Sequence, residues 1–96
     1  MLISVPITQA HIDQGTRDSC RGCAAALALA AVTHPSTKIA VQSYRVTIDG
    51  WPCEPSPELG RFVMAFDAGK PVEPCAFQLD VPERALNRFK EFVAAA

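Results

Sequence analysis

The sequence predicts one small α+β domain spanning residues 1–96, with helices packed on a mainly antiparallel sheet. At about 100–200 residues per domain, the length leaves room for only one. Strand-like and helix-like segments follow one another in the order β-α-α-β-β-β-α-β-α. This order lacks the regular alternation of a doubly wound parallel fold. The pair Asp49-Gly50 lies between two strand-like segments and is typical of a tight antiparallel hairpin.

The first two elements are predicted to be a strand and a short helix. Apolar residues alternate along Leu2–Ile7, and Pro6 favours a sheet edge because proline lacks a backbone N–H. Thr8 is a suitable cap for a helix over Gln9–Gln14, and we expect Gly15 to end that helix in the left-handed conformation.

A second helix is expected to begin after a cap at Asp18 or Ser19 and to end at Thr33-His34-Pro35, because a residue before proline avoids the helical region. Its main apolar stripe consists of Cys20, Cys23, Ala24, Leu27 and Ala31. The other faces are also small and apolar. Such a helix is either central or covered by a partner, so self-association into a homo-oligomer is a further prediction.

The middle of the chain predicts a β-rich stretch that contains one tight hairpin. Residues 38–48 are β-like, but their apolar positions change from odd to even numbers, which requires a bulge or break near Gln42-Ser43. The turn at Asp49-Gly50 then leads into a short return strand over residues 51–54, limited by the prolines on it.

The last third predicts a helix, a strand and a helix. Ser56 and Pro57 are a typical cap and first helical residue, and Gly69 with Pro71 stops that helix. A strand follows over residues 73–79. The final helix is expected to start with a capping box formed by Asp80 and Glu83. Its apolar stripe comprises Ala85, Leu86, Phe89, Phe92 and Val93.

Composition and charge exclude several classes of protein. Apolar residues make up 49% of the chain and charged residues 20%, which excludes intrinsic disorder. A net charge of −1 argues against a strongly basic nucleic-acid binder, so we expect no sequence-specific nucleic-acid partner. The longest apolar run, residues 23–32, is too short to cross a membrane. Because the first residues lack a basic region and a cleavage site, we expect a cytoplasmic protein.

The charge is unevenly spread along the chain. Residues 1–48 carry four bases and two acids, whereas residues 49–96 carry five bases and eight acids. This asymmetry predicts a modest positive patch formed by the first half of the chain, unless these charges are simply part of a solvated surface.

The pair Cys20 and Cys23 is the sharpest local motif. Its C-x-x-C spacing supplies half of a tetrahedral zinc site, which His11 or His34 could complete. At a helix N-terminus the same pair could instead be a reactive thiol with a lowered pKa. The plainer interpretation is two free cysteines facing the core. The expected cofactor is therefore none, with zinc as the alternative.

An anion-binding site is also predicted. Backbone N–H groups at Asp18 and Ser19 would be free at the start of the second helix, and helix N-termini bind anions. Arg17 and Arg21 flank this position. Ordinary solvation and ion pairing would explain the same arginines without a ligand.

A second group of candidate binding residues lies on the predicted hairpin. Tyr44, Arg45 and Trp51 combine aromatic rings with a guanidinium, which suits stacking on a base or packing in an interface. Trp51 could instead close the core beside Tyr44. No nucleophile elbow, metal-protease helix or glycine-rich phosphate loop occurs, and no acid–base pair is assembled, so we predict that the protein is not an enzyme.

Several segments of the chain show a familiar pattern, and together they cover most of it. They comprise residues 8–15, 17–23 with the Ala/Leu-rich helix that follows, 44–50, Pro57-Glu58, Phe62, 65–69, 71–74 and Phe77. Together they resemble a family of small proteins of unassigned activity encoded by tailed phages of actinobacteria. The resemblance implies a phage accessory protein, a class in which many members antagonise host defence or redirect a host enzyme.

We therefore expect a non-enzymatic protein that acts by binding a host protein or a small anionic ligand such as a signalling nucleotide. The alternative is a small zinc- or thiol-dependent module built on Cys20 and Cys23.

Overall fold

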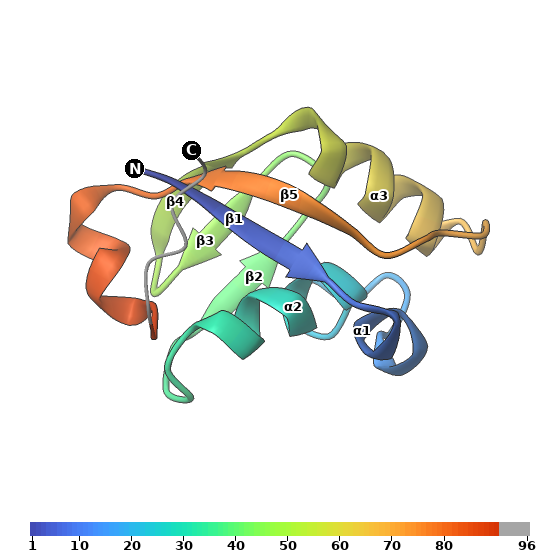
Figure 1. Ribbon diagram of the computed structural model, residues 1–96, viewed down its shortest axis with the longest axis horizontal. Helices are drawn as coiled ribbons and strands as arrows, with labels where there is room; N and C mark the ends of the chain where they lie inside the picture. Colours follow the sequence, from blue (N-terminus) through green and yellow to red (C-terminus); the bar gives the residue numbers. More distant parts are fainter. Residues whose placement is uncertain (91–96) are drawn as a thin grey trace.

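The computed structural model describes residues 1–90. Within this range five strands form one sheet in the order β1-β5-β4-β3-β2, and all neighbouring strands are antiparallel (Figure 1). The strands are β1 (Leu2–Ile7), β2 (Ile39–Val41), β3 (Val46–Ile48), β4 (Trp51–Pro55) and β5 (Cys75–Asp80). The helices are α1 (Gln9–Gln14), α2 (Ala24–Val32), α3 (Pro57–Asp67) and the 3₁₀-helix η1 (Glu83–Arg88). The predicted α+β class and element order are confirmed.

Helix α2 joins the two edges of the sheet. The edge strands are β1 and β2, and α2 packs against both of them, so the curled sheet closes around this helix. Strand β1 is an edge strand, as Pro6 predicts, because proline has no backbone N–H to donate to a neighbouring strand. Helix α3 packs against β4, β5 and α2.

The core is formed by alternate residues of the strands and by the first half of α2. Four of its alanines and Leu29 are buried, because the surrounding strands and helices approach closely, whereas Ala30 and Ala31 are exposed. From α3 the core receives Leu59, Phe62, Val63 and Phe66. The strands and α3 thus cover the first half of α2, and the exposed residues of the helix lie in its second half.

The predicted hairpin at Asp49-Gly50 is present, and the predicted break near Gln42-Ser43 is a second hairpin. Gln42 and Arg45 exchange two backbone hydrogen bonds, so Ser43 and Tyr44 form the tip between β2 and β3, where the apolar pattern changes phase. At the second turn, Asp49 and Gly50 have φ angles of 50° and 83°, as a type I′ hairpin turn requires.

The start of α2 differs from the prediction. The helix begins at Ala24 and is capped by Cys23, whose Sγ accepts a hydrogen bond from the Ala26 N–H. Neither Asp18 nor Ser19 caps it, because Asp18 has a φ of 55° and the chain turns before the helix starts. The residues from 18 to 22 therefore form turns.

Gly15 also differs from the prediction, because its φ is −70° and not left-handed. The glycine is required by packing. A Cβ at this position would lie 2.6 Å from the Ala24 backbone nitrogen. The end of α1 therefore rests directly on the first residue of α2.

The predicted capping box of the last helix is wrong. Asp80 ends β5, and its carboxylate accepts a hydrogen bond from the Met1 amino group at 3.1 Å. The following helix is a 3₁₀-helix without a side-chain cap. Of its predicted stripe, Ala85 and Phe89 are buried and Leu86 is partly buried, while Phe92 and Val93 lie outside the described residues.

Helix α3 starts and ends close to the predicted residues. Pro57 is its first residue, and Gly69, with a φ of 74°, follows its end. The Ser56 hydroxyl makes no cap and accepts a hydrogen bond from the Gln78 N–H in β5. Among residues 1–90, no helix combines the length and the apolar character needed to cross a membrane.

Candidate functional site

The turn that precedes α2 sends its side chains to two different grooves. Arg21 lines a groove between α2 and the β2–β3 hairpin. Asp18, Ser19, Cys20 and Cys23 line another groove, which lies towards α3. Residues that are adjacent in the sequence therefore serve two separate surfaces.

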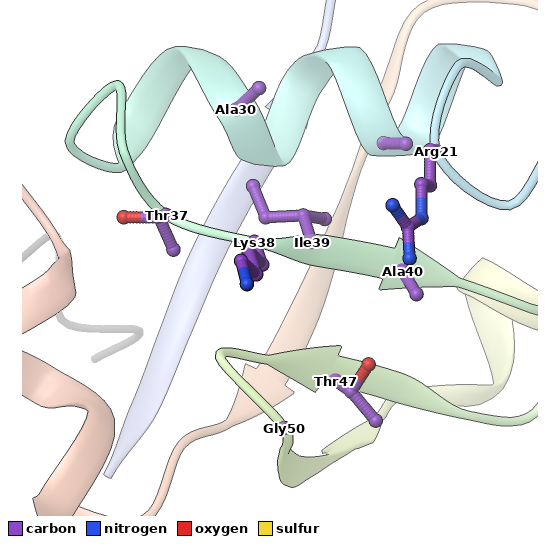
Figure 2. Close-up of a pocket in the computed structure, with 9 residues that line it drawn as sticks. Arg21, Ala30, Thr37, Lys38, Ile39, Ala40, Thr47 and Gly50 are labelled. Carbon is purple, nitrogen blue, oxygen red and sulfur yellow. The ribbon is translucent and has the colours of Figure 1, made fainter.

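The first of these, called the cationic groove below, has a volume of about 510 Å³, which is within the usual range of small-molecule sites. Figure 2 shows Arg21 extending from the start of α2 over Ala40 of β2, with Thr47 on the neighbouring strand. The complete lining is Arg21, Ala26, Ala30, Thr37, Lys38, Ile39, Ala40, Thr47 and Gly50.

The lining of the cationic groove contains two cations and no carboxylate. Arg21 and Lys38 are both exposed, and neither takes part in an ion pair within residues 1–90. The rest of the lining is mostly small or apolar, with the hydroxyl of Thr47 among it. The Thr37 hydroxyl oxygen is buried without a partner among the described residues, but it points away from the groove (Figure 2). The groove therefore suits an anionic ligand.

A smaller hollow of about 190 Å³ continues the cationic groove along the hairpin. It is lined by Ala40, Gln42, Arg45 and Thr47, so it shares Ala40 and Thr47 with the larger groove. Glu54 and Asp49 line neither hollow. Three cations from the first half of the chain thus lie on one continuous face, which agrees with the positive patch that the charge asymmetry predicts.

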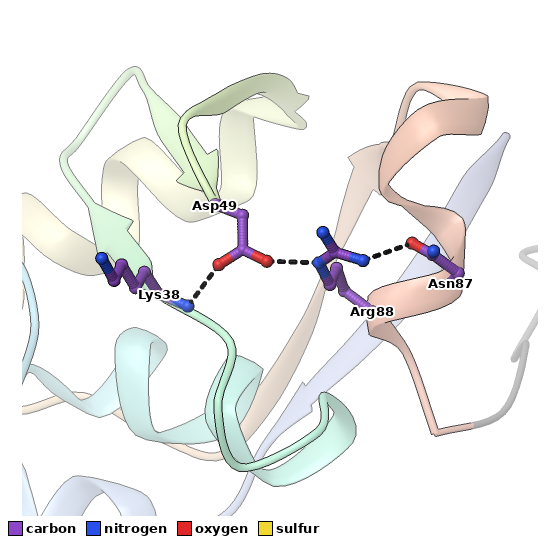
Figure 3. A network of polar contacts seen from close by, with 4 residues as sticks. All are labelled: Lys38, Asp49, Asn87 and Arg88. Atoms are coloured by element: carbon purple, nitrogen blue, oxygen red, sulfur yellow. Dashed lines mark hydrogen bonds and ion pairs between the residues drawn. The ribbon is translucent and has the colours of Figure 1, made fainter.

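Lys38 is held by its backbone and leaves its ammonium group free. The Lys38 N–H donates to the Asp49 carboxylate at 2.7 Å, and Arg88 forms an ion pair with the same carboxylate (Figure 3). Figure 3 shows the Lys38 side chain pointing away from Asp49. The hydrogen bond from Lys38 and, second, the one from Arg88 lower the pKa of Asp49. Asp49 therefore acts as a structural anchor that fixes the start of β2.

The predicted anion site at the start of α2 is not formed. The Asp18 N–H donates to the Asp67 carboxylate at 2.9 Å, and the Ser19 hydroxyl accepts from the Gly22 N–H. The true first residue of the helix, Ala24, is fully buried and is covered by Gly15. A ligand therefore cannot reach the helix N-terminus.

The groove towards α3, called the thiol groove below, has a different chemistry. Cys20 is exposed and Cys23 is buried, and Asp18 and Asp67 are the charged groups in the lining. Burial raises the pKa of Cys23, which is the opposite of the lowered pKa that a reactive thiolate needs. Among residues 1–90, no three metal-ligating side chains are close enough together to hold a metal ion. His11 instead completes a capping box with Thr8 in α1.

The remaining predicted residues are not brought together. The Arg17 side chain lies against Gly69, which follows α3. A Cβ atom added to Gly69 would be 3.1 Å from Nη1 of Arg17. Tyr44 is 75% exposed at the tip of the first hairpin, whereas Trp51 follows the second turn at the other end of β3. The Trp51 ring stacks with Arg84, whose guanidinium carbon is 5.1 Å from the ring centroid.

Sequence reasoning missed Lys38, Ala40 and Thr47 as members of the site. Ala40 lies in the middle of β2, and Lys38 and Gln42 are the alternate residues just before and just after this strand, so all three share one face. The pattern was present in the sequence, but the strand register that puts Ala40 opposite Thr47 was not. A comparison of the chain with protein-family models, curated protein sequences and solved structures finds no match.

Proposed function

We propose that this protein is a non-enzymatic binding protein that captures a small anionic ligand in the cationic groove. One observation carries the proposal. Arg21 and Lys38 face the same groove, and no carboxylate shares its lining, although acids outnumber bases in the chain.

The residue types in the groove suit a phosphate ester. The planar guanidinium of Arg21 can donate two parallel hydrogen bonds to a phosphate, and the ammonium of Lys38 adds a second positive charge. Ala26, Ala30 and Gly50 have little or no side chain, which leaves room for the rest of the ligand.

The resemblance to phage accessory proteins favours a signalling nucleotide of the host as the ligand. A protein that binds such a nucleotide without converting it would lower its free concentration and so antagonise the host response. Direct inhibition of a host protein is the competing form of the same proposal.

The test is a calorimetric titration of the protein with inorganic phosphate and with adenosine monophosphate at low salt. We expect saturable binding that weakens as salt is added, because the cations are exposed. Arg21→Ala combined with Lys38→Ala is expected to weaken binding at least about tenfold, since a hydrogen bond to a charged group contributes about 1.5–3 kcal/mol.

Arg17→Ala is the matched control, because Arg17 belongs to the same loop but lies against Gly69 outside the cationic groove. Thermal unfolding of each variant checks that the fold is retained. Absence of binding by either phosphate compound, or an equal loss in Arg17→Ala, would contradict the proposal.

A further inference from the structure

The tip of the β2–β3 hairpin rests on α3 beside the thiol groove (Figure 1). A Cβ atom added to Gly60 would lie 2.7 Å from the Ser43 carbonyl oxygen, so the close approach requires a glycine in α3. Met64 lies four residues after Gly60 and therefore on the same side of the helix. Ser43 and Met64 both line the thiol groove, so the tip and the helix border it together.

Two large apolar side chains are exposed beside this groove. Tyr44, at the tip, is 75% exposed and Met64 is 67% exposed, more than any other large apolar residue in the described range 1–90. Val41, Val63 and Cys23 contribute further apolar atoms to the lining. Large apolar side chains that gather around one groove, in place of being scattered, are typical of a protein–protein contact.

The charges of the tip and the groove are complementary. Asp18 and Asp67 are the charged residues of the lining, and neither carboxylate takes part in an ion pair within residues 1–90. Arg45, next to Tyr44 in the sequence, is exposed and also has no ion-pair partner among these residues. The tip thus presents an aromatic ring beside a cation, whereas the groove combines an apolar lining with two carboxylates.

We infer that two copies of this chain form a dimer in which each copy places its hairpin tip in the thiol groove of the other. Tyr44 packs on the partner's Met64. Arg45 pairs with the carboxylates of the partner's Asp18 and the partner's Asp67. Because the tip borders the groove of its own copy, a single two-fold axis forms both contacts and closes the assembly. The cationic groove takes no part, so this inference is independent of the proposed function.

The first test is sedimentation equilibrium at low salt, with protein concentrations from about 10 μM to about 1 mM. We expect a monomer–dimer equilibrium that weakens as salt is added. Tyr44→Ser and Met64→Gln should each weaken dimerisation at least about tenfold, because each removes a large apolar side chain from the interface. Leu2→Ser replaces an exposed leucine at the opposite edge of the sheet, and as the matched control it should leave the equilibrium unchanged.

Charge reversal tests whether each tip meets a groove. Arg45→Glu and Asp18→Lys should each weaken the dimer, because like charges then face each other in both contacts. An equimolar mixture of the two variants should recover it, since the altered tip faces the altered groove and the unaltered tip faces the unaltered groove. Thermal unfolding verifies that Asp18→Lys, a change at a residue with a φ of 55°, retains the fold.

Cys20 gives an independent reading of the same contact because it is exposed and lines the groove. Its labelling by iodoacetamide should be fast in dilute protein and should slow as the protein concentration rises. The Tyr44→Ser variant should lose this dependence on concentration.

Three results would overturn the inference. The first is a protein that stays monomeric up to about 1 mM, which would leave the groove open to a different protein. The second is a dimer that survives both Tyr44→Ser and Met64→Gln, because its interface would then lie elsewhere. The third is a mixture of Arg45→Glu and Asp18→Lys that dimerises no better than either variant alone.

Discussion

The cationic groove and the thiol groove lie on two sides of one turn and differ in nearly every chemical respect. The cationic groove contains Arg21 and Lys38 and no carboxylate, whereas the thiol groove contains Asp18, Asp67 and two cysteines. The two grooves are similar in volume, about 510 and 520 Å³. The difference between them is therefore one of charge and not of size.

The comparison teaches that the direction of a side chain, and not its distance along the chain, decides which site it joins. Asp18 reverses the chain with a φ of 55°, and Cys23 starts α2. Between them Arg21 turns to one surface, while Cys20 turns to the other. A cluster of charged and sulfur-bearing residues in a sequence can thus be split by a single turn.

The largest expected effect is on the packing that holds this turn in place. Gly15→Ala places a Cβ 2.6 Å from the Ala24 backbone nitrogen, which cannot move without shifting the start of α2. We expect a loss of about 1–3 kcal/mol in the free energy of unfolding, as for other overpacked sites. Each kcal/mol corresponds to a fall in Tm of about 4–8 °C in a domain of this size, measurable by calorimetry.

Gly22→Ala is the matched control in the same loop. The closest atom to its Cβ would be the Ser19 side-chain oxygen at 3.1 Å, and the other neighbours, at 3.8 Å or more, are in ordinary van der Waals contact. We therefore expect a much smaller change in Tm. If the two variants lose equal stability, the close packing of Gly15 on α2 is not what positions the two grooves.

A smaller effect concerns the two cysteines of the thiol groove. Cys20 is exposed, whereas Cys23 is buried and has a raised pKa because of that burial. We expect Cys20 to react with iodoacetamide at pH 7 at least about ten times faster than Cys23, as followed by peptide mass spectrometry. Cys53, whose burial raises its pKa to about 11, provides an internal slow-reacting control.

The same measurement examines the zinc- or thiol-dependent alternative. Equally fast labelling of Cys20 and Cys23 would support a reactive pair. Joint protection of both by one equivalent of zinc would support a metal site, with ligands beyond those that the described residues bring together. Either result would move the functional assignment from the cationic groove to the thiol groove.

The smallest expected effect is the pH dependence of the stability that the Asp49 carboxylate contributes. Because the pKa of Asp49 is lowered in the folded protein, its carboxylate stabilises the fold at pH values above the ordinary pKa of 3.8. This contribution is lost as the pH falls through the lowered pKa. We expect Asp49→Asn to lower Tm at pH 7, and the difference from the unaltered protein to shrink in acid.

Asparagine is chosen because it tolerates the positive φ of Asp49, so the substitution removes charge without straining the turn. Glu73→Gln, a similar loss of charge in the exposed segment before β5, is the control and should change Tm little at either pH. A difference for Asp49→Asn that stays constant as the pH falls would contradict the role of its charge.

Most of the fold could be predicted from local patterns in the sequence. Alternating apolar residues predicted β1, and Pro57 predicted the start of α3. The phase change near Gln42 predicted a bulge or break, and the structure has the tip of a hairpin there. These features depend on the preferences of a few neighbouring residues. The prediction of where α2 starts was wrong because Cys23 is an unusual cap. Its Sγ accepts the hydrogen bond that the side-chain oxygen of Asp18 or Ser19 was expected to accept.

The sequence by itself determined the element order, the turn at Asp49 and Gly50, and an excess of cations in the first half of the chain. Only the tertiary structure decided which of those cations share a surface. Arg21 and Lys38 line one groove, and Arg45 lines the hollow beside it, because α2 packs on the edge strand β2 and β2 pairs with β3; Arg17 lies against Gly69. The physical reason is that local patterns follow from backbone preferences over a few residues, whereas a site depends on contacts between segments far apart in the chain.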